Sequence, residues 1–110
     1  EEVDFASIGS NDLTQYLSAA DRMNPEVAAY YKSDSTAMLR LLGFVFREFS
    51  KREKEISVCG EMAGNPETAQ LLVGLGARKL SMSSGNIAGV KAKLAECTLQ
   101  ELTALAEKKL

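Results

Sequence analysis

Three short polar segments carry the residues of this sequence that are best suited to chemistry. They are residues 9–12 (Gly-Ser-Asn-Asp), residues 59–61 (Cys-Gly-Glu) and residues 81–84 (Ser-Met-Ser-Ser). Their side chains include a carboxylate that can bind a hard cation, an amide that can donate to an anion and a thiol that can act as an acid. Asn, Asp and Ser also favour ordinary turns and helix caps, so these residue types alone leave both interpretations open.

Each polar segment lies at the end of a short apolar run that predicts a strand. The runs cover residues 3–8, 56–59 and 79–82. Helical periodicity or a helix-start signal appears at residues 13–19, 36–54, 66–73, 87–96 and 99–108, and a short helix opens at Asn24-Pro25. Strands that alternate with helices favour a parallel sheet. Reactive groups of such sheets gather at the carboxyl ends of the strands, so we expect the three segments at one edge.

Local signals predict where several helices begin and end. Ser10 or Asn11 is expected to cap the first helix, and Thr98 the last one. Asn65-Pro66 predicts a helix start, and the glycines at positions 74 and 76 predict its end. The alternating charges of residues 47–55 predict a solvated helix end rather than a binding patch.

Composition excludes several classes of partner. The formal net charge is -2, whereas nucleic-acid-binding surfaces are normally basic. No apolar run approaches the roughly 20 residues that are needed to span a bilayer. The chain contains no His, and Cys59 and Cys97 lie too far apart for metal-ligand spacing. We therefore expect no nucleic acid and no membrane as partners, and reduced thiols in a cytoplasmic protein.

The expected sheet cannot be complete by itself. Three parallel strands leave two edges unpaired. The sequence starts Glu-Glu-Val-Asp, without Met, so we expect it to be a piece of a longer polypeptide. Either the missing part of a barrel or a second copy of the chain would then cover the open edges.

Two of the polar segments and one apolar run carry a family resemblance. Residues 7–16 (Ser-Ile-Gly-Ser-Asn-Asp-Leu-Thr-Gln-Tyr), followed by Asp21-Arg22, resemble the second signature of phosphoenolpyruvate-utilising enzymes. Residues 59–64 (Cys-Gly-Glu-Met-Ala-Gly) resemble the Cys-Gly-Glu segment of that family, and residues 80–83 resemble its last barrel strand. The Glu-Met-Ala-Gly continuation favours the Enzyme I branch, with phosphoenolpyruvate synthase and pyruvate phosphate dikinase as alternatives.

The resemblance implies both a fold and an activity. The fold would be α/β, with residues 1–110 as the C-terminal portion of a (β/α)8 TIM barrel that binds phosphoenolpyruvate, containing about three parallel strands with flanking helices. The intact enzyme would transfer the phosphoryl group of phosphoenolpyruvate, with Mg2+, to its own His on a missing N-terminal domain. That domain would pass the group to a phosphocarrier protein for sugar uptake. The chain would take part in a homodimer and be inactive alone; an assembly module is the alternative function.

The resemblance also implies roles for four residues. Asp12 matches a Mg2+ ligand, Asn11 and Arg22 match substrate-binding residues beside it, and Cys59 matches the acid that protonates the enolate of pyruvate. Gly9 and Gly60 would allow a neighbouring loop or the substrate to approach closely. Each role has a plain structural alternative: a helix-start carboxylate, a helix cap, a surface salt bridge and a small buried side chain, respectively.

Overall fold

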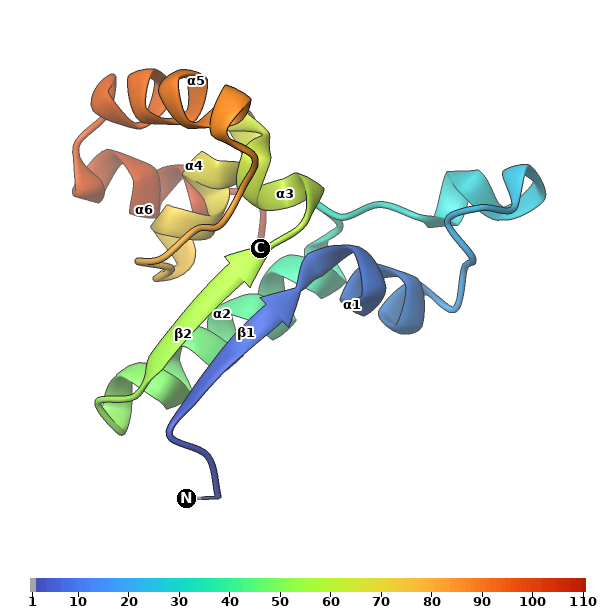
Figure 1. Ribbon diagram of the computed structural model, residues 1–110, viewed down its shortest axis with the longest axis horizontal. Helices are drawn as coiled ribbons and strands as arrows, with labels where there is room; N and C mark the ends of the chain where they lie inside the picture. Colours follow the sequence, from blue (N-terminus) through green and yellow to red (C-terminus); the bar gives the residue numbers. More distant parts are fainter. Residues whose placement is uncertain (1) are drawn as a thin grey trace.

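Helices and strands alternate along the chain in the computed structural model, which describes residues 2–110 (Figure 1). The elements, in order, are β1 (Phe5–Gly9), α1 (Ser10–Ser18), the 3-10 helix η1 (Pro25–Tyr30), α2 (Thr36–Lys51), β2 (Glu55–Cys59), α3 (Glu61–Gly64), α4 (Pro66–Leu75), α5 (Ser84–Ala95) and α6 (Leu99–Glu107). All the helical segments that the sequence predicts are present, with ends shifted by a few residues. The turn α3, directly after Gly60, is the helix that the apolar pattern does not predict.

The sheet consists of two parallel strands in one register. β1 pairs with β2 from Phe5 opposite Glu55 to Gly9 opposite Cys59. Side chains alternate along β1: Ala6 and Ile8 are half-buried, while Phe5, Ser7 and Gly9 are exposed. The predicted parallel pairing is confirmed, and both strands end at the same edge (Figure 1).

The third predicted strand, residues 79–82, is reduced to a single bridge. Leu80 pairs in parallel with Val58. Two hydrogen bonds make this bridge: the Val58 amide donates to the Lys79 carbonyl at 3.0 Å, and the Ser81 amide donates to the Val58 carbonyl at 2.8 Å. The expectation of about three strands is therefore wrong for residues 2–110, because pairing stops after one residue and α5 begins at Ser84. The polar residues that follow Leu80 line a cavity instead of continuing a ladder.

One face of the sheet is covered by an apolar core. Ser35 caps α2 by accepting a hydrogen bond from the Met38 amide at 3.3 Å, and apolar side chains then recur at three- and four-residue steps toward the strands. The buried core combines α2, β2, α3 and α4, with Ala77 at the end of α4: Met38, Leu39, Leu42, Phe46, Val58, Met62, Ala63, Leu71, Leu72 and Ala77. Figure 1 shows α2 running behind both strands. This packing holds β1 and β2, and therefore the polar segments that follow them, in place.

The opposite face and one strand edge remain open within residues 2–110. Phe5, on β1, is 71% exposed, and β1 has no strand partner on its other side. No helix in this part of the chain is long and apolar enough to cross a bilayer.

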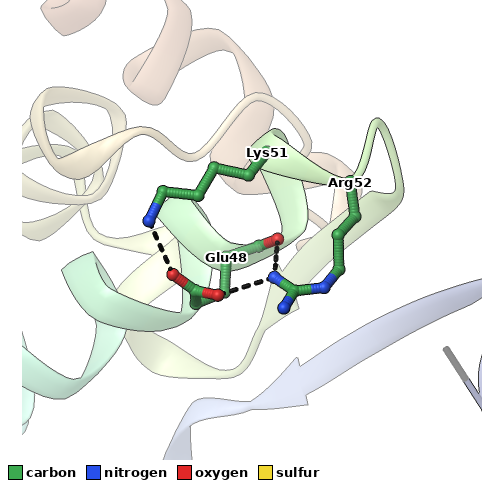
Figure 2. A network of polar contacts seen from close by, with 3 residues as sticks. All are labelled: Glu48, Lys51 and Arg52. Carbon is green, nitrogen blue, oxygen red and sulfur yellow. Dashed lines mark hydrogen bonds and ion pairs between the residues drawn. The ribbon is translucent and has the colours of Figure 1, made fainter.

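The C-terminal end of α2 carries an exposed charge network (Figure 2). The Glu48 carboxylate accepts hydrogen bonds from Arg52 Nη1 at 2.6 Å and Lys51 Nζ at 2.9 Å. These bonds, the Arg52 bond first, lower the pKa of Glu48 below its ordinary value. The expectation of a solvated helix end in residues 47–55 is confirmed.

The direction of the Glu48 pKa shift predicts a small pH dependence of stability. A carboxyl whose pKa is lower in the folded state stabilises that state above its unfolded pKa, about pH 4. The contribution is lost as the pH falls through the lowered folded pKa. We expect Glu48→Gln to remove this contribution, so that the thermal unfolding temperature falls less steeply at acidic pH and changes only slightly near neutral pH. An unchanged fall of the unfolding temperature at acidic pH would contradict the role of this network.

Candidate functional site

The register of β1 and β2 brings the first two polar segments together. Gly9 lies opposite Cys59 as the last pair of the ladder, so Ser10 to Asp12 and Cys59 to Glu61 leave the same edge of the sheet. A Cβ atom at Gly9 would lie 3.8 Å from Asp12 Oδ2, which places the carboxylate over the end of β1. The two segments therefore meet where the sequence predicts.

The third polar segment lines an open cavity with the first two. This cavity, of about 620 Å³, is lined by Asn11, Cys59, Gly60, Glu61, Gly64, Asn65, Pro66, Ser81, Met82, Ser83 and Asn86. Its polar lining consists of three Asn side chains, two Ser side chains, the thiol of Cys59 and the carboxylate of Glu61, with no Lys or Arg among the described residues that line it. The expectation that all three segments share one edge is confirmed by this cavity.

A second cavity, of about 580 Å³, lies at the opposite end of the strands. Four cationic residues line it together with Glu55: Arg47, Lys54, Arg78 and Lys79. Arg78 Nη1 donates to the carbonyls of Val73 at 3.1 Å and Ala77 at 2.7 Å, and Lys79 pairs with Glu55 at 2.6 Å. Cations at the C-terminal end of a helix such as α4 complement its free carbonyls. The charge of this cavity therefore has a structural cause.

Cys59 ends β2 with its thiol half-buried at the cavity. Its Sγ donates to the Ile8 carbonyl at 3.5 Å, and it forms no disulfide. Its own carbonyl accepts a hydrogen bond from Ser10 Oγ at 2.7 Å. The side chain is thus a weakly held S–H donor, whereas the backbone of the same residue is held firmly.

Asn11 lies in the first turn of α1 and faces the end of β2. The N-cap of α1 is Gly9, with no side-chain cap, so the prediction that Ser10 or Asn11 caps this helix is wrong. The reason is that a backbone donor from the neighbouring segment takes the amide oxygen: the Glu61 amide donates to Asn11 Oδ1 at 3.2 Å. With its oxygen occupied, Asn11 has its NH2 group left to donate to a ligand.

Asp12 is exposed in the same first turn. Among residues 2–110 no group of three or more His, Cys, Asp or Glu could hold a metal ion. Asp12 can therefore supply one carboxylate ligand, and the others would have to come from a substrate, water or other parts of a longer protein. That set suits Mg2+, which usually takes one or two carboxylates together with phosphate oxygens and water.

Arg22 is not part of the cavity lining. α1 ends at Ala19, which adopts a left-handed conformation with φ of 50°, and the chain then leads outward to η1 (Figure 1). The Arg22 amide donates to Gln15 Oε1 at 3.2 Å, while its guanidinium is exposed. Directly after η1, the Tyr31 hydroxyl donates to the Asn11 carbonyl at 3.1 Å. The loop that carries Arg22 is therefore tied back to the site, but its substrate-binding role stays a prediction.

Comparison with known proteins agrees with this geometry. Residues 1–99 match the family described as PEP-utilising enzyme, PEP-binding domain, where PEP is phosphoenolpyruvate. The chain belongs to this family.

Three relatives illustrate the similarity. A protein of Salmonella typhimurium named "Phosphoenolpyruvate-dependent phosphotransferase system" is 44% identical over 98% of the chain. The protein of that name in Escherichia coli K12 is 44% identical over 100%, and the "Multiphosphoryl transfer protein" of Xanthomonas campestris pv. campestris is 47% identical over 97%. The chain spans 14%, 15% and 13% of their lengths, respectively. The family resemblance in the sequence is confirmed, and the chain corresponds to a small part of each of these proteins.

Residue types alone do not identify two fully buried hydroxyls that lie beside the cavity. Ser10 and Thr14 are both fully buried, and Thr14 Oγ1 donates to the Ser10 carbonyl at 2.7 Å. A signal was present, because Gly60 was expected to permit a close approach. The structure confirms it for Gly60, which has φ of +95° and where a Cβ atom would overlap the Ser10 hydroxyl. It does not confirm the same expectation for Gly9, where a Cβ atom would lie at an ordinary 3.8 Å from Asp12 Oδ2.

This contact predicts a large effect of Gly60→Ala. An alanine would have to adopt a left-handed conformation and displace Ser10, at a combined cost of about 2 kcal/mol or more. Gly85→Ala is the matched control, because nothing lies within 4 Å of a Cβ there and alanine favours the helix. Thermal unfolding should show a clear loss of stability for the first variant and none for the second. Equal behaviour of the two variants would contradict the close packing of residues 10 and 60.

Proposed function

We propose that this chain is the C-terminal portion of a (β/α)8 barrel in a phosphoenolpyruvate-dependent phosphotransferase and supplies part of its substrate site. The observation that carries the proposal is the paired end of β1 and β2, where Asn11, Asp12 and Cys59 leave the sheet at one edge. Family membership supports phosphoenolpyruvate as the ligand, and the names of the relatives support the phosphotransferase branch over the synthase or dikinase.

The phosphoryl acceptor would lie outside these residues. The chain contains no His, so we propose a histidine on a separate N-terminal domain, which would pass the group to a phosphocarrier protein for sugar uptake. The P–O bond of phosphoenolpyruvate breaks, a P–N bond forms at that histidine, and the enolate of pyruvate remains. Phosphoryl transfer depends mainly on positioning and charge stabilisation. The chain holds part of the required groups, so it is expected to be inactive alone.

Residues 11, 12 and 22 would bind the substrate. Asn11 donates its NH2 hydrogens to an anionic oxygen, because Glu61 occupies its carbonyl oxygen. Asp12 serves as the one carboxylate ligand of this chain to Mg2+, which when bound would neutralise charge on the phosphoryl oxygens. Arg22 reaches the same anion through movement of its exposed loop, since a guanidinium offers bidentate, charge-assisted hydrogen bonds.

Cys59 would complete the reaction. Its S–H bond breaks as a C–H bond forms at C3 of the enolate, the C2–O bond becomes a carbonyl, and sulfur keeps the electron pair until solvent returns a proton. The hydrogen bond from Sγ to the Ile8 carbonyl, at 3.5 Å, supports this role, because an S–H group is a weak donor that a ligand can draw away from the carbonyl.

The open surfaces support assembly with other protein. The free edge of β1 and the exposed large apolar side chains Phe5, Tyr16, Met23 and Tyr30 are features that a protein neighbour usually covers. We propose that the remaining barrel strands cover β1 and that the full protein is a cytoplasmic homodimer. A pure assembly role is the alternative, but it would give no reason for the polar cavity at the strand ends.

Replacing the thiol tests the proposed chemistry. In the longer phosphotransferase that contains this segment, Cys59→Ala should slow pyruvate formation about 100-fold, because the general acid is lost. Formation of the phosphoenzyme in the first turnover should be largely retained. Cys97→Ala is the control, since this second half-buried thiol lies outside the cavity lining. Unchanged pyruvate release by Cys59→Ala would remove Cys59 from the acid role.

Replacing the carboxylate tests the metal assignment. Asp12→Asn in the same protein should raise the Mg2+ concentration needed for half-maximal activity by roughly tenfold or more, because a charged ligand becomes a neutral one. Asp21→Asn is the matched control: Asp21 Oδ1 accepts only the Met23 amide at 2.9 Å, and an Asn oxygen can do the same. Titration of activity with Mg2+ measures both variants. Identical Mg2+ curves for Asp12→Asn and the wild type would refute the assignment.

A further inference from the structure

We propose that Ser10 is a positioning residue whose buried hydroxyl fixes the backbone of Cys59 and thereby directs the thiol toward the bound enolate. This inference rests on the proposed acid role of Cys59. It assigns a task to a residue that lies beside the site but outside the cavity lining.

The hydroxyl links two segments that are distant in the sequence. Ser10 is fully buried, and its Oγ donates to the Cys59 carbonyl at 2.7 Å across 49 residues. The ladder between β1 and β2 ends with the pair Gly9 and Cys59. The serine hydroxyl thus holds the peptide group that leaves β2, at the point where ladder pairing has stopped.

Helix capping does not account for the position of this serine. The N-cap of α1 is Gly9, and the Ser10 hydroxyl bonds to the other strand rather than to an amide of its own helix. The residue is also held from behind, because Thr14 Oγ1 donates to its carbonyl at 2.7 Å. Its hydroxyl is therefore aimed at Cys59 by a buried turn of α1.

Steric fit makes the contact specific. A Cβ atom at Gly60 would overlap the Ser10 hydroxyl, so the hydroxyl fills the space left free by the glycine. One residue further, the Glu61 amide donates to Asn11 Oδ1 at 3.2 Å. Two consecutive side chains of α1 therefore hold the two peptide groups on either side of Gly60 Cα, so neither peptide group has much freedom to rotate.

A fixed backbone leaves the thiol of Cys59 one simple motion. Rotation about its Cα–Cβ bond can exchange the weak bond to the Ile8 carbonyl, at 3.5 Å, for contact with a ligand in the cavity. If the carbonyl lost its partner, the peptide could turn and the S–H group would approach C3 from variable directions. Misplacement of a reacting group by about 1 Å can cost roughly 100-fold in rate.

The test measures the stereochemistry of protonation in the longer phosphotransferase. A single geometric isomer of phosphoenolpyruvate with one deuterium at C3 is turned over in tritiated water, and the chirality of the pyruvate methyl group is determined. Formation of the phosphoenzyme in the first turnover is measured in parallel. We expect the wild type to give one configuration, and Ser10→Ala to keep phosphoenzyme formation, to give a methyl group close to racemic and to form pyruvate roughly tenfold more slowly.

Three companion variants separate the positioning role from a general loss of packing and from loss of the acid. Ser10→Thr keeps the hydroxyl and should restore the wild-type configuration. Thr68→Val removes another hydroxyl-to-carbonyl bond of 2.7 Å, from Thr68 Oγ1 to the Met62 carbonyl, and should leave the configuration unchanged. Cys59→Ala should give a racemic methyl group, because the acid itself is missing.

The outcomes distinguish the two proposals. A racemic product from Cys59→Ala together with wild-type chirality from Ser10→Ala overturns the positioning role and leaves the acid role intact. Wild-type chirality from Cys59→Ala overturns the acid role, and the positioning role with it. If Ser10→Ala does not fold, Ser10→Cys replaces it, because its thiol is a weaker donor of similar size: an intermediate loss of chirality supports the proposal, and full wild-type chirality refutes it.

Discussion

The parallel register of β1 and β2 is the constraint on which the site depends. It places Gly9 opposite Cys59, so the two polar segments leave the sheet together. A shift by one residue would turn every side chain of a strand to its other face, and Ile8 or Val58 would then leave the core. The apolar core formed by α2 and α4 therefore selects the register, and the register in turn places an amide, a carboxylate and a thiol at one edge.

Hydrophobic patterning was sufficient to predict this edge from the sequence. The runs ending at Gly9 and Cys59 identified two strands, their separation by helices identified parallel pairing, and parallel pairing placed the polar segments together. The pattern predicted a full strand at residues 79–82, because an apolar run cannot reveal that Leu80 pairs with Val58 alone. Extended pairing needs a neighbouring strand that runs alongside over several residues, and a single run carries no information about that neighbour.

The finer geometry was not predictable because it depends on competition between partners. Ser10 and Asn11 have the residue types of helix caps, and local rules predict caps from them. In the structure both side chains bond instead to the segment that begins at Cys59. Only the strand pairing supplies those partners, so residues 9–12 alone could not decide between the two outcomes. Arg22 shows the same limit, since the segment that carries it is closed by a hydrogen bond between Tyr31 and Asn11, which are 20 residues apart.

A firmly held backbone and a weakly bonded thiol are both useful in a residue that transfers a proton. An acid must keep its proton until the enolate forms, and must then reach carbon along one direction. A strong hydrogen bond on sulfur would oppose the transfer, whereas a loose backbone would spoil the direction. Cys59 combines a weak hydrogen bond at Sγ with a short hydroxyl bond at its carbonyl. The buried hydroxyl of Ser10 and the bare Cα of Gly60 are what make that combination possible within a two-stranded sheet.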